Sequence, residues 1–173
     1  IPTRTLRFNL PAARDRVLAL LADTAADRLW VPAFEGAHQD HDAANALAAT
    51  LADRIAVWEF AEYGFAGGRP RRNRFPDPAP GDTVIDLTAD EKAVKVRALE
   101  LYGSEAANLA HTGTARESIR PLPRHAYDRP PHDGRLFYQR FQWVPFRHPR
   151  VDFTDPWDVA RDLARFYGSV SDS

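Results

Sequence analysis

The residues best suited to chemistry lie in one short polar stretch, in which His38, Asp40, His41 and Asp42 occupy four of five consecutive positions. A neutral imidazole is a good zinc ligand and can also donate or accept a proton near neutral pH, while a carboxylate beside it fixes the ring and its tautomer. Two histidines three positions apart need not share one role. One can bind a metal ion while the other faces a substrate, with Asp40 orienting its neighbours. The same spacing also occurs in polar loops without a function.

The flanking residues predict where this stretch lies. Residues 28–32 have the composition of a short buried strand, and residues 42–53 form an Ala-rich helical segment. The positions from His38 to His41 are therefore expected in the turn between a strand and a helix. In an open α/β sheet, ligands bind outside the carboxyl ends of the strands, where helix N-termini add a partial positive charge.

The N-terminal part of the chain is predicted to build the sheet that such a site needs. Residues 3–10 are expected to form a strand, and residues 11–25 an amphipathic helix with proline at its start. Together with residues 28–32 they would make a βαβ unit, which implies a parallel sheet and a right-handed crossover. Residues 55–60 add another buried strand. The fold expected is Rossmann-like α/β, a mostly parallel sheet with flanking helices.

After this strand the regular alternation is expected to end. A glycine-rich turn is predicted at residues 64–68, followed by a basic loop at residues 69–74 that contains four arginines. Such a loop can clamp a phosphate or carboxylate, but a solvated loop is about twice as common. Residues 83–87 are predicted to be a strand. Thr88 and Glu91 then have the spacing of a capping box, which predicts a helix to about residue 102.

The last third of the chain is expected to be less regular. Turn and extended segments are predicted at residues 120–124 and 129–134, and a strand at residues 136–144. The aromatic side chains of that strand could wall a substrate pocket, although core packing or an oligomer contact is about three times as common.

A C-terminal helix is expected to begin with Asp155 as N-cap and Pro156 in its first turn, and to end at Gly168. The remaining histidines are interpreted as structural or exposed unless the fold brings one to His41; they are His111, His125, His132 and His148.

Residues 35–42, followed by the Ala-rich helix, resemble the second motif of the LmbE-like, or PIG-L, family of zinc-dependent N-deacetylases, a His-Pro-Asp-His run in which Gln39 here replaces proline. Residues 92–105 resemble the family's late helix, which ends near a Ser-Gln pair; here Glu105 follows Ser104. The similarity extends over most of residues 25–110.

The family's first motif, a His-x-Asp-Asp run that supplies two zinc ligands and the general base, has no match in this chain. The chain begins with Ile1 and contains no Met. We therefore expect one α/β domain over residues 1–173 that is the C-terminal portion of a larger LmbE-like domain, and a site that is incomplete in this chain.

The resemblance implies a role for each residue of the stretch. His41 would ligate Zn²⁺, His38 would stabilise the tetrahedral oxyanion or donate a proton, and Asp40 would orient its neighbours. Some relatives place a tyrosine two residues before the first histidine, where this chain has Gly36. The implied reaction is removal of an acetyl group from an N-acetylated sugar or sugar conjugate. The alternative is a non-catalytic module that binds a carbohydrate or another small ligand on the same scaffold.

Composition limits the remaining possibilities. The length of 173 residues suits one domain, and 44% hydrophobic with 27% charged residues is ordinary for a globular protein. A net charge of −1 does not favour nucleic acid or an anionic membrane as a partner. No apolar run is long enough to span a bilayer and no leader is visible, so a cytoplasmic protein is expected, with an oligomer possible. Without cysteine, zinc would be held by histidine and carboxylate.

Overall fold

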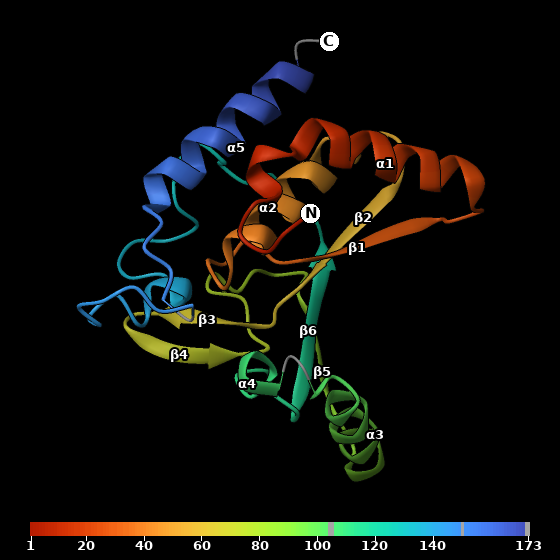
Figure 1. Ribbon diagram of the computed structural model, residues 1–173. Coiled ribbons are helices and arrows are strands. Elements are labelled where there is room, and N and C mark those ends of the chain that lie inside the picture. Colours follow the sequence, from red (N-terminus) through yellow and green to blue (C-terminus); the bar gives the residue numbers. More distant parts are fainter. Residues whose placement is uncertain (104–105, 150, 172–173) are drawn as a thin grey trace.

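The computed structural model describes residues 1–103, 106–149 and 151–171, and it has a mixed α/β architecture (Figure 1). The predicted α/β class is confirmed at this level. In chain order the elements are η1 (Leu6–Phe8), α1 (Leu10–Asp23), β1 (Arg28–Pro32), α2 (Gln39–Ala49), β2 (Ala56–Phe60), β3 (Tyr63–Ala66), β4 (Arg69–Arg72), β5 (Thr83–Asp86), α3 (Ala89–Glu100), α4 (Ala106–Leu109), β6 (Arg116–Pro121), η3 (Phe137–Gln139) and α5 (Pro156–Ser171).

The main sheet has four strands in the order β1-β2-β6-β5. β1 and β2 are parallel and are joined through α2, so they form a βαβ unit, whereas β6 is antiparallel to both β2 and β5. The prediction of a mostly parallel sheet is therefore wrong beyond β1 and β2. It failed because the prolines after residue 120 suggested a turn instead of β6. Pro121 is the last residue of β6, where its missing N–H is tolerated.

The N-terminal segment does not form the predicted strand over residues 3–10. Arg4 adopts a left-handed φ of 64°, η1 follows, and α1 begins at Leu10. The Asn9 side-chain amide donates to the Thr5 carbonyl, which closes this tight turn. The helix predicted at residues 11–25 is confirmed, but the βαβ unit predicted to precede residue 32 is wrong.

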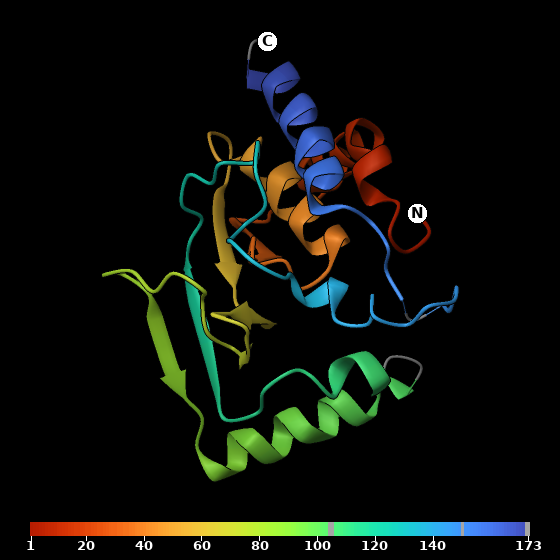
Figure 2. The same ribbon diagram turned by 90° about the vertical axis from the view of Figure 1, so that its left-hand side faces the viewer.

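The core lies where α1, α2 and α5 pack against one another beside β1 and β2 (Figures 1 and 2). Its fully buried side chains include Leu10 of α1, Leu51 just after α2 and Leu163 of α5. Truncating one such leucine to alanine typically costs about 2–5 kcal/mol of stability, so these contacts hold α2 and its N-terminal residues in place.

β5 and α3 form an arm that extends from this body (Figure 2). Every β5 residue is exposed and α3 has no buried residue. The strand predicted at residues 83–87 is confirmed as β5. The predicted capping box is also present, because the Thr88 hydroxyl accepts from the Glu91 N–H and the Glu91 carboxylate accepts from the Thr88 N–H.

Two segments predicted as turn and loop form a hairpin instead. β3 and β4 pair antiparallel across a turn in which Gly67 and Gly68 both have positive φ, a conformation that glycine adopts without strain. The predicted basic loop is thus largely strand β4. Its residues are nevertheless exposed, as a solvated basic segment would be.

The strand predicted at residues 136–144 is also wrong. Phe137 and Tyr138 are adjacent and both buried, which a strand with one solvated face does not allow, and they lie in the short helix η3. The C-terminal helix is confirmed, with the Asp155 carboxylate accepting from the Trp157 N–H, but it passes Gly168 and ends at Ser171. No helix in the described part of the chain is long and apolar enough to cross a membrane.

Candidate functional site

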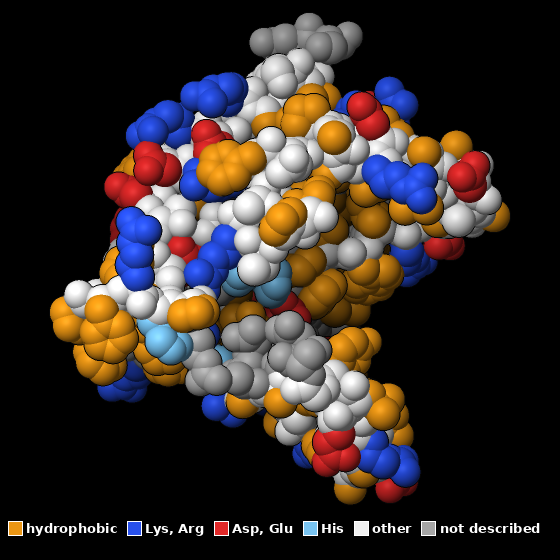
Figure 3. Space-filling model, in the orientation of Figure 1, with side chains coloured by type: hydrophobic (Ala, Val, Ile, Leu, Met, Phe, Trp, Pro, Cys, Tyr) orange, Lys and Arg blue, Asp and Glu red, His pale blue; other side chains and the backbone are white. Residues whose placement is uncertain are grey.

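A cavity of about 770 Å³ lies between the N-terminal end of α2, the residues around η3 and the α3–α4 segment. His38, Asp40 and His41 all line it, so the structure brings the three predicted site residues together. Figure 3 shows histidine, acidic and basic surfaces meeting in the hollow between the body and the arm.

The predicted turn at residues 38–41 is the first turn of α2. Helix α2 begins at Gln39, three residues earlier than predicted, because His38 acts as its N-cap: its Nδ1 accepts from the Asp40 N–H at 3.1 Å. Histidine was not recognised as a cap, since Ser, Thr, Asp and Asn are the usual ones. The consequence is that His38 and His41 share one face of the helix end, with ring centroids 5.5 Å apart.

The cap hydrogen bond fixes the state of the His38 ring. A backbone N–H can only donate, so Nδ1 is an acceptor and the neutral ring carries its proton on Nε2. Burial lowers the pKa of His38, against the opposing effect of Asp40 and Asp152. The neutral ring therefore presents an N–H donor. A metal ligand needs a nitrogen lone pair, so His38 in this state suits hydrogen-bond donation and not ligation.

His41 is in a different state: its Nδ1 lies 3.1 Å from the Glu62 Oε2, and no hydrogen-bond partner among the described residues is aligned with it. Burial, with a smaller effect of His38, lowers the pKa of His41 to about 4, so the ring is neutral at pH 7. Burial also raises the pKa of Glu62. Glu62 was missed in the sequence, although it follows the carboxyl end of β2, where loop residues of such sheets gather.

Asp40 ties the N-terminal segment to α2. Its Oδ2 accepts from the Arg4 N–H at 2.5 Å and its Oδ1 from the Leu6 N–H at 3.0 Å. The distance from Asp40 Oδ2 to His38 Nδ1 is 3.8 Å, which is too long for a hydrogen bond. Asp40 thus acts on His38 through its own backbone N–H and through its charge.

Two buried carboxyls accept hydrogen bonds from backbone N–H groups close to the site residues. Asp42 accepts from the Gly36 N–H at 3.1 Å, and burial raises its pKa to about 8. Glu35 accepts from the Glu62 N–H, and burial raises its pKa well above the ordinary value. Gly36 has φ of 69°, and a Cβ there would lie 2.8 Å from Leu136 Cδ2. A tyrosine at this position would not fit this structure.

Of the other histidines, His111 also lines the cavity. His125 lies elsewhere, with its Nε2 2.9 Å from the Glu59 Oε2. His132 and His148 line separate surface depressions. Tyr138, not singled out in the sequence, also faces the cavity and is only 3% exposed, with no hydrogen-bond partner for its hydroxyl.

The donor set fits part of a zinc site. A buried imidazole nitrogen without a hydrogen-bond partner lies beside a carboxylate oxygen, and Zn²⁺ accepts both kinds of ligand. Across residues 1–103, 106–149 and 151–171, no three His, Cys, Asp or Glu side chains are grouped so as to hold a metal ion. His41 and Glu62 can thus supply two ligands, and a catalytic zinc takes about three from protein.

Comparison of the chain with protein-family models, with curated proteins and with solved structures found no match. The resemblance to LmbE-like deacetylases therefore stays a prediction. Its Ser104-Glu105 pair lies outside the described residues.

Proposed function

We propose that this chain contributes part of the active site of a zinc-dependent N-deacetylase acting on an N-acetylated sugar or sugar conjugate. The proposal is carried by the different states of two histidines in one cavity. His38 has its proton fixed on Nε2 by a backbone donor, and His41 is a neutral ring whose Nδ1, beside Glu62, has no aligned hydrogen-bond partner among the described residues. Amide hydrolysis at a metal needs both kinds of group, a hydrogen-bond donor and a ligand.

His41 and Glu62 would hold the metal, and a further ligand would come from outside the described residues. By resemblance, that ligand and the general base would belong to a His-x-Asp-Asp motif, for which this chain has no match. When bound, zinc lowers the pKa of a water molecule and polarises the scissile carbonyl. Desolvation keeps the His41 ring neutral, and a neutral ring is the form that can ligate.

His38 would stabilise the oxyanion that develops on the acetyl carbonyl. Its Nε2–H is available because Nδ1 is already engaged, and the cap bond holds the ring before substrate arrives. The N-terminus of α2 adds a partial positive charge at the same place. Asp40 positions this end of the helix by anchoring the Arg4 and Leu6 N–H groups.

The scaffold and the size of the cavity support the same proposal. His38 and Glu62 follow the carboxyl ends of the parallel strands β1 and β2, where α/β proteins place their ligands, so we infer a Rossmann-like origin for this part. A volume of about 770 Å³ suits a sugar conjugate, and Tyr63, Tyr138 and Phe141 offer aromatic faces to a sugar ring. A cytoplasmic location and an oligomeric state stay predictions from the sequence.

The test uses the full-length gene product, and measures zinc per chain and acetate released from an N-acetylglucosamine conjugate. We expect His41→Ala to lose tightly bound zinc. His38→Ala should keep zinc and lose about 10²- to 10³-fold in turnover, the usual effect of removing an oxyanion donor. His132→Ala, outside the cavity, is the matched control.

Two results would contradict the proposal. Zinc lost from His38→Ala but kept by His41→Ala would reverse the roles of the two histidines. Sugar binding by the wild-type protein without zinc and without turnover would instead identify a non-catalytic binding module.

A further inference from the structure

We propose that the same cavity binds an oxyanion, a phosphate or carboxylate group carried by its ligand, at the guanidinium of Arg140. The inference rests on the proposed function in one respect, that this ligand is the N-acetylated substrate. Its substrate class is then an N-acetylated sugar that bears a negative charge.

The first observation is that Arg140 has no acidic partner among the residues that the structure describes. Its Nη1 donates to the Phe137 carbonyl at 3.2 Å, whereas its Nε is buried without any acceptor. Burial without an acceptor is costly for a charged donor. The other cavity arginine, Arg4, lies 3.6 Å from Asp152 and donates to the carbonyls of Pro149 and Val151. Arg140 therefore carries the positive charge of this cavity that is not balanced locally.

Of the three carboxylates among the described residues that line the cavity, two accept hydrogen bonds from other groups and one lies beside the neutral His41 ring. Asp40 accepts from two backbone N–H groups, Asp152 accepts from Gln39 Nε2 at 2.8 Å, and Glu62 faces His41. In keeping with this, burial lowers the pKa of Arg140, and the charge of Arg4 acts in the same direction against an opposing effect of Tyr63. An anion from outside would remove this imbalance.

The second observation is that the guanidinium lies over two aromatic rings. Arg140 Cζ lies 4.4 Å from the centroid of the Phe137 ring and 4.7 Å from that of Phe141. Stacking on aromatic faces orders the side chain before a ligand binds, which reduces the entropy lost on binding. A planar guanidinium recognises carboxylate and phosphate through two parallel hydrogen bonds, which favours these groups over halide or a neutral oxygen.

The third observation is Tyr138, which lines the cavity, is 3% exposed, and has a buried hydroxyl without a hydrogen-bond partner among the described residues. Burial raises the pKa of this hydroxyl, so it remains protonated and can donate. A buried donor without an acceptor normally costs about 1–3 kcal/mol, and a bound oxyanion would satisfy it. Tyr138 and Arg140 are two residues apart in and just after η3, so one short segment supplies both donors.

The test is calorimetric titration of the chain kept metal-free with EDTA, using N-acetylglucosamine 1-phosphate, N-acetylmuramic acid and neutral N-acetylglucosamine as ligands. We expect at least one of the charged sugars to bind at least tenfold more tightly than the neutral sugar. The phosphate and carboxylate ligands show which oxyanion is preferred.

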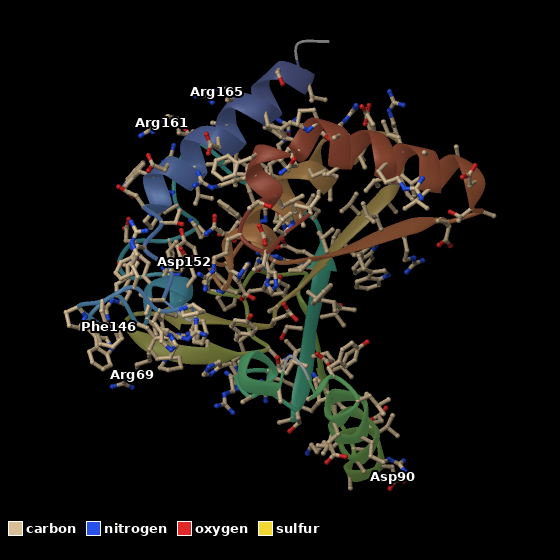
Figure 4. The ribbon with its side chains drawn as sticks, viewed as in Figure 1. Arg69, Asp90, Phe146, Asp152, Arg161 and Arg165 are labelled. Carbon is tan, nitrogen blue, oxygen red and sulfur yellow. The ribbon has the colours of Figure 1, made fainter. Side chains whose placement is uncertain are left out.

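The variants show whether Arg140 is responsible. Arg140→Gln should remove the preference for charged sugars, and Arg140→Lys, which keeps the charge and loses the planar pair of donors, should retain only part of it. The matched control is Arg69→Gln, since Arg69 is exposed in β4 at the outer end of the hairpin, away from Asp152 (Figure 4). Thermal unfolding of each variant confirms that it is folded.

Equal binding of charged and neutral sugars, or no measurable binding of any, would overturn the inference. So would an equal loss in Arg69→Gln and Arg140→Gln, because general electrostatic attraction would then explain the effect. The measurement uses neither zinc nor turnover. A charged sugar that binds through Arg140 but is not deacetylated would therefore overturn the proposed function while leaving the oxyanion site in place.

Discussion

Replacing Glu59 by Gln should destabilise the chain strongly, because Glu59 is the centre of its most buried ion pair. Glu59 is fully buried, its Oε1 accepts from Arg120 Nε at 2.6 Å, and its Oε2 accepts from Asn45 Nδ2 at 2.8 Å. Glu59 and Arg120 are paired positions on the neighbouring strands β2 and β6, so their ion pair connects the βαβ unit to the rest of the sheet.

The expected cost follows from what the change leaves behind. Removing one partner of a buried ion pair typically costs about 3–5 kcal/mol, because the other charge stays buried without compensation. Arg120 is 5% exposed but keeps contacts with Asp77 at 3.3 Å and Asp82 at 3.5 Å. These contacts should hold the loss near the lower limit, at about 3 kcal/mol.

The assay is urea unfolding at pH 7, with Asp128→Asn as the control for loss of an exposed ion pair. Asp128 pairs with Arg129 at the surface, where solvent screens the two charges, so its loss should change stability little. A double-mutant cycle with Arg120→Gln should give a coupling of roughly 1–3 kcal/mol. If Glu59→Gln costs no more than Asp128→Asn, the reasoning about this buried pair is refuted.

The pH dependence supplies a second check on the same pair. Hydrogen bonds and charges from His125 and Arg120 lower the pKa of Glu59 despite its burial. A lowered pKa stabilises the folded state at pH values above the unfolded pKa of about 4.3, and this contribution is lost as the pH falls through the folded pKa. Wild-type stability should therefore fall more steeply below about pH 4 than that of Glu59→Gln.

Three further predictions concern the site and its surroundings. In the metal-free chain, the free energy of unfolding of Asp42→Asn relative to wild type should rise by about 4 kcal/mol between pH 5 and pH 8 in urea unfolding, because a folded pKa of about 8 makes wild-type stability fall over this range. An equal difference between variant and wild type at both pH values would contradict this. The control is Asp53→Asn, at an exposed position. Replacing Arg69, Arg71, Arg72 and Arg74 together by Gln should change catalytic efficiency on a neutral N-acetyl sugar by less than about 0.5 kcal/mol, since all four side chains are exposed. A selective loss on charged substrates would show that these arginines bind them. In zinc titrations, the 173-residue chain should bind zinc weakly, because His41 and Glu62 supply only two ligands, and Glu62→Gln should weaken binding further. The chain should also release no acetate from an N-acetyl sugar. Stoichiometric sub-micromolar zinc binding with turnover would show that the site is complete.

The sequence predicted the elements that local pattern determines. The capping box at Thr88, the strand at residues 28–32 and the C-terminal helix with Asp155 at its cap all depend on neighbouring residues, and all are present. The failures have causes that act over long distances. Residues 3–10 are predicted to be a strand, but the carboxylate of Asp40 accepts hydrogen bonds from two of their backbone N–H groups and holds them in a turn.

The candidate site divides in the same way. The grouping of His38, Asp40 and His41 was visible because the three residues lie within one helical turn. Glu62 and Tyr138 were not, because they reach the cavity through the parallel pairing of β1 with β2 and through η3. Nothing near either residue in the sequence indicates that it lines the same cavity as His38.

The arginines show why composition alone was a poor guide to charge in the cavity. The four closely spaced arginines at residues 69–74 could form an anion clamp, although a solvated segment is the more common case, and all four are exposed to solvent in and just after β4, where water compensates their charge. The single Arg140, in an aromatic segment expected to be a strand, lies instead on two phenylalanine rings with a buried Nε that has no acceptor. One ordered, desolvated guanidinium contributes more to the free energy of anion binding than several hydrated ones do. The reason is that the side chain has already lost its conformational entropy and its hydration on folding, so that binding does not incur these two costs again. Burial and the absence of a partner, which sequence does not record, therefore identify the stronger candidate for binding a charged substrate.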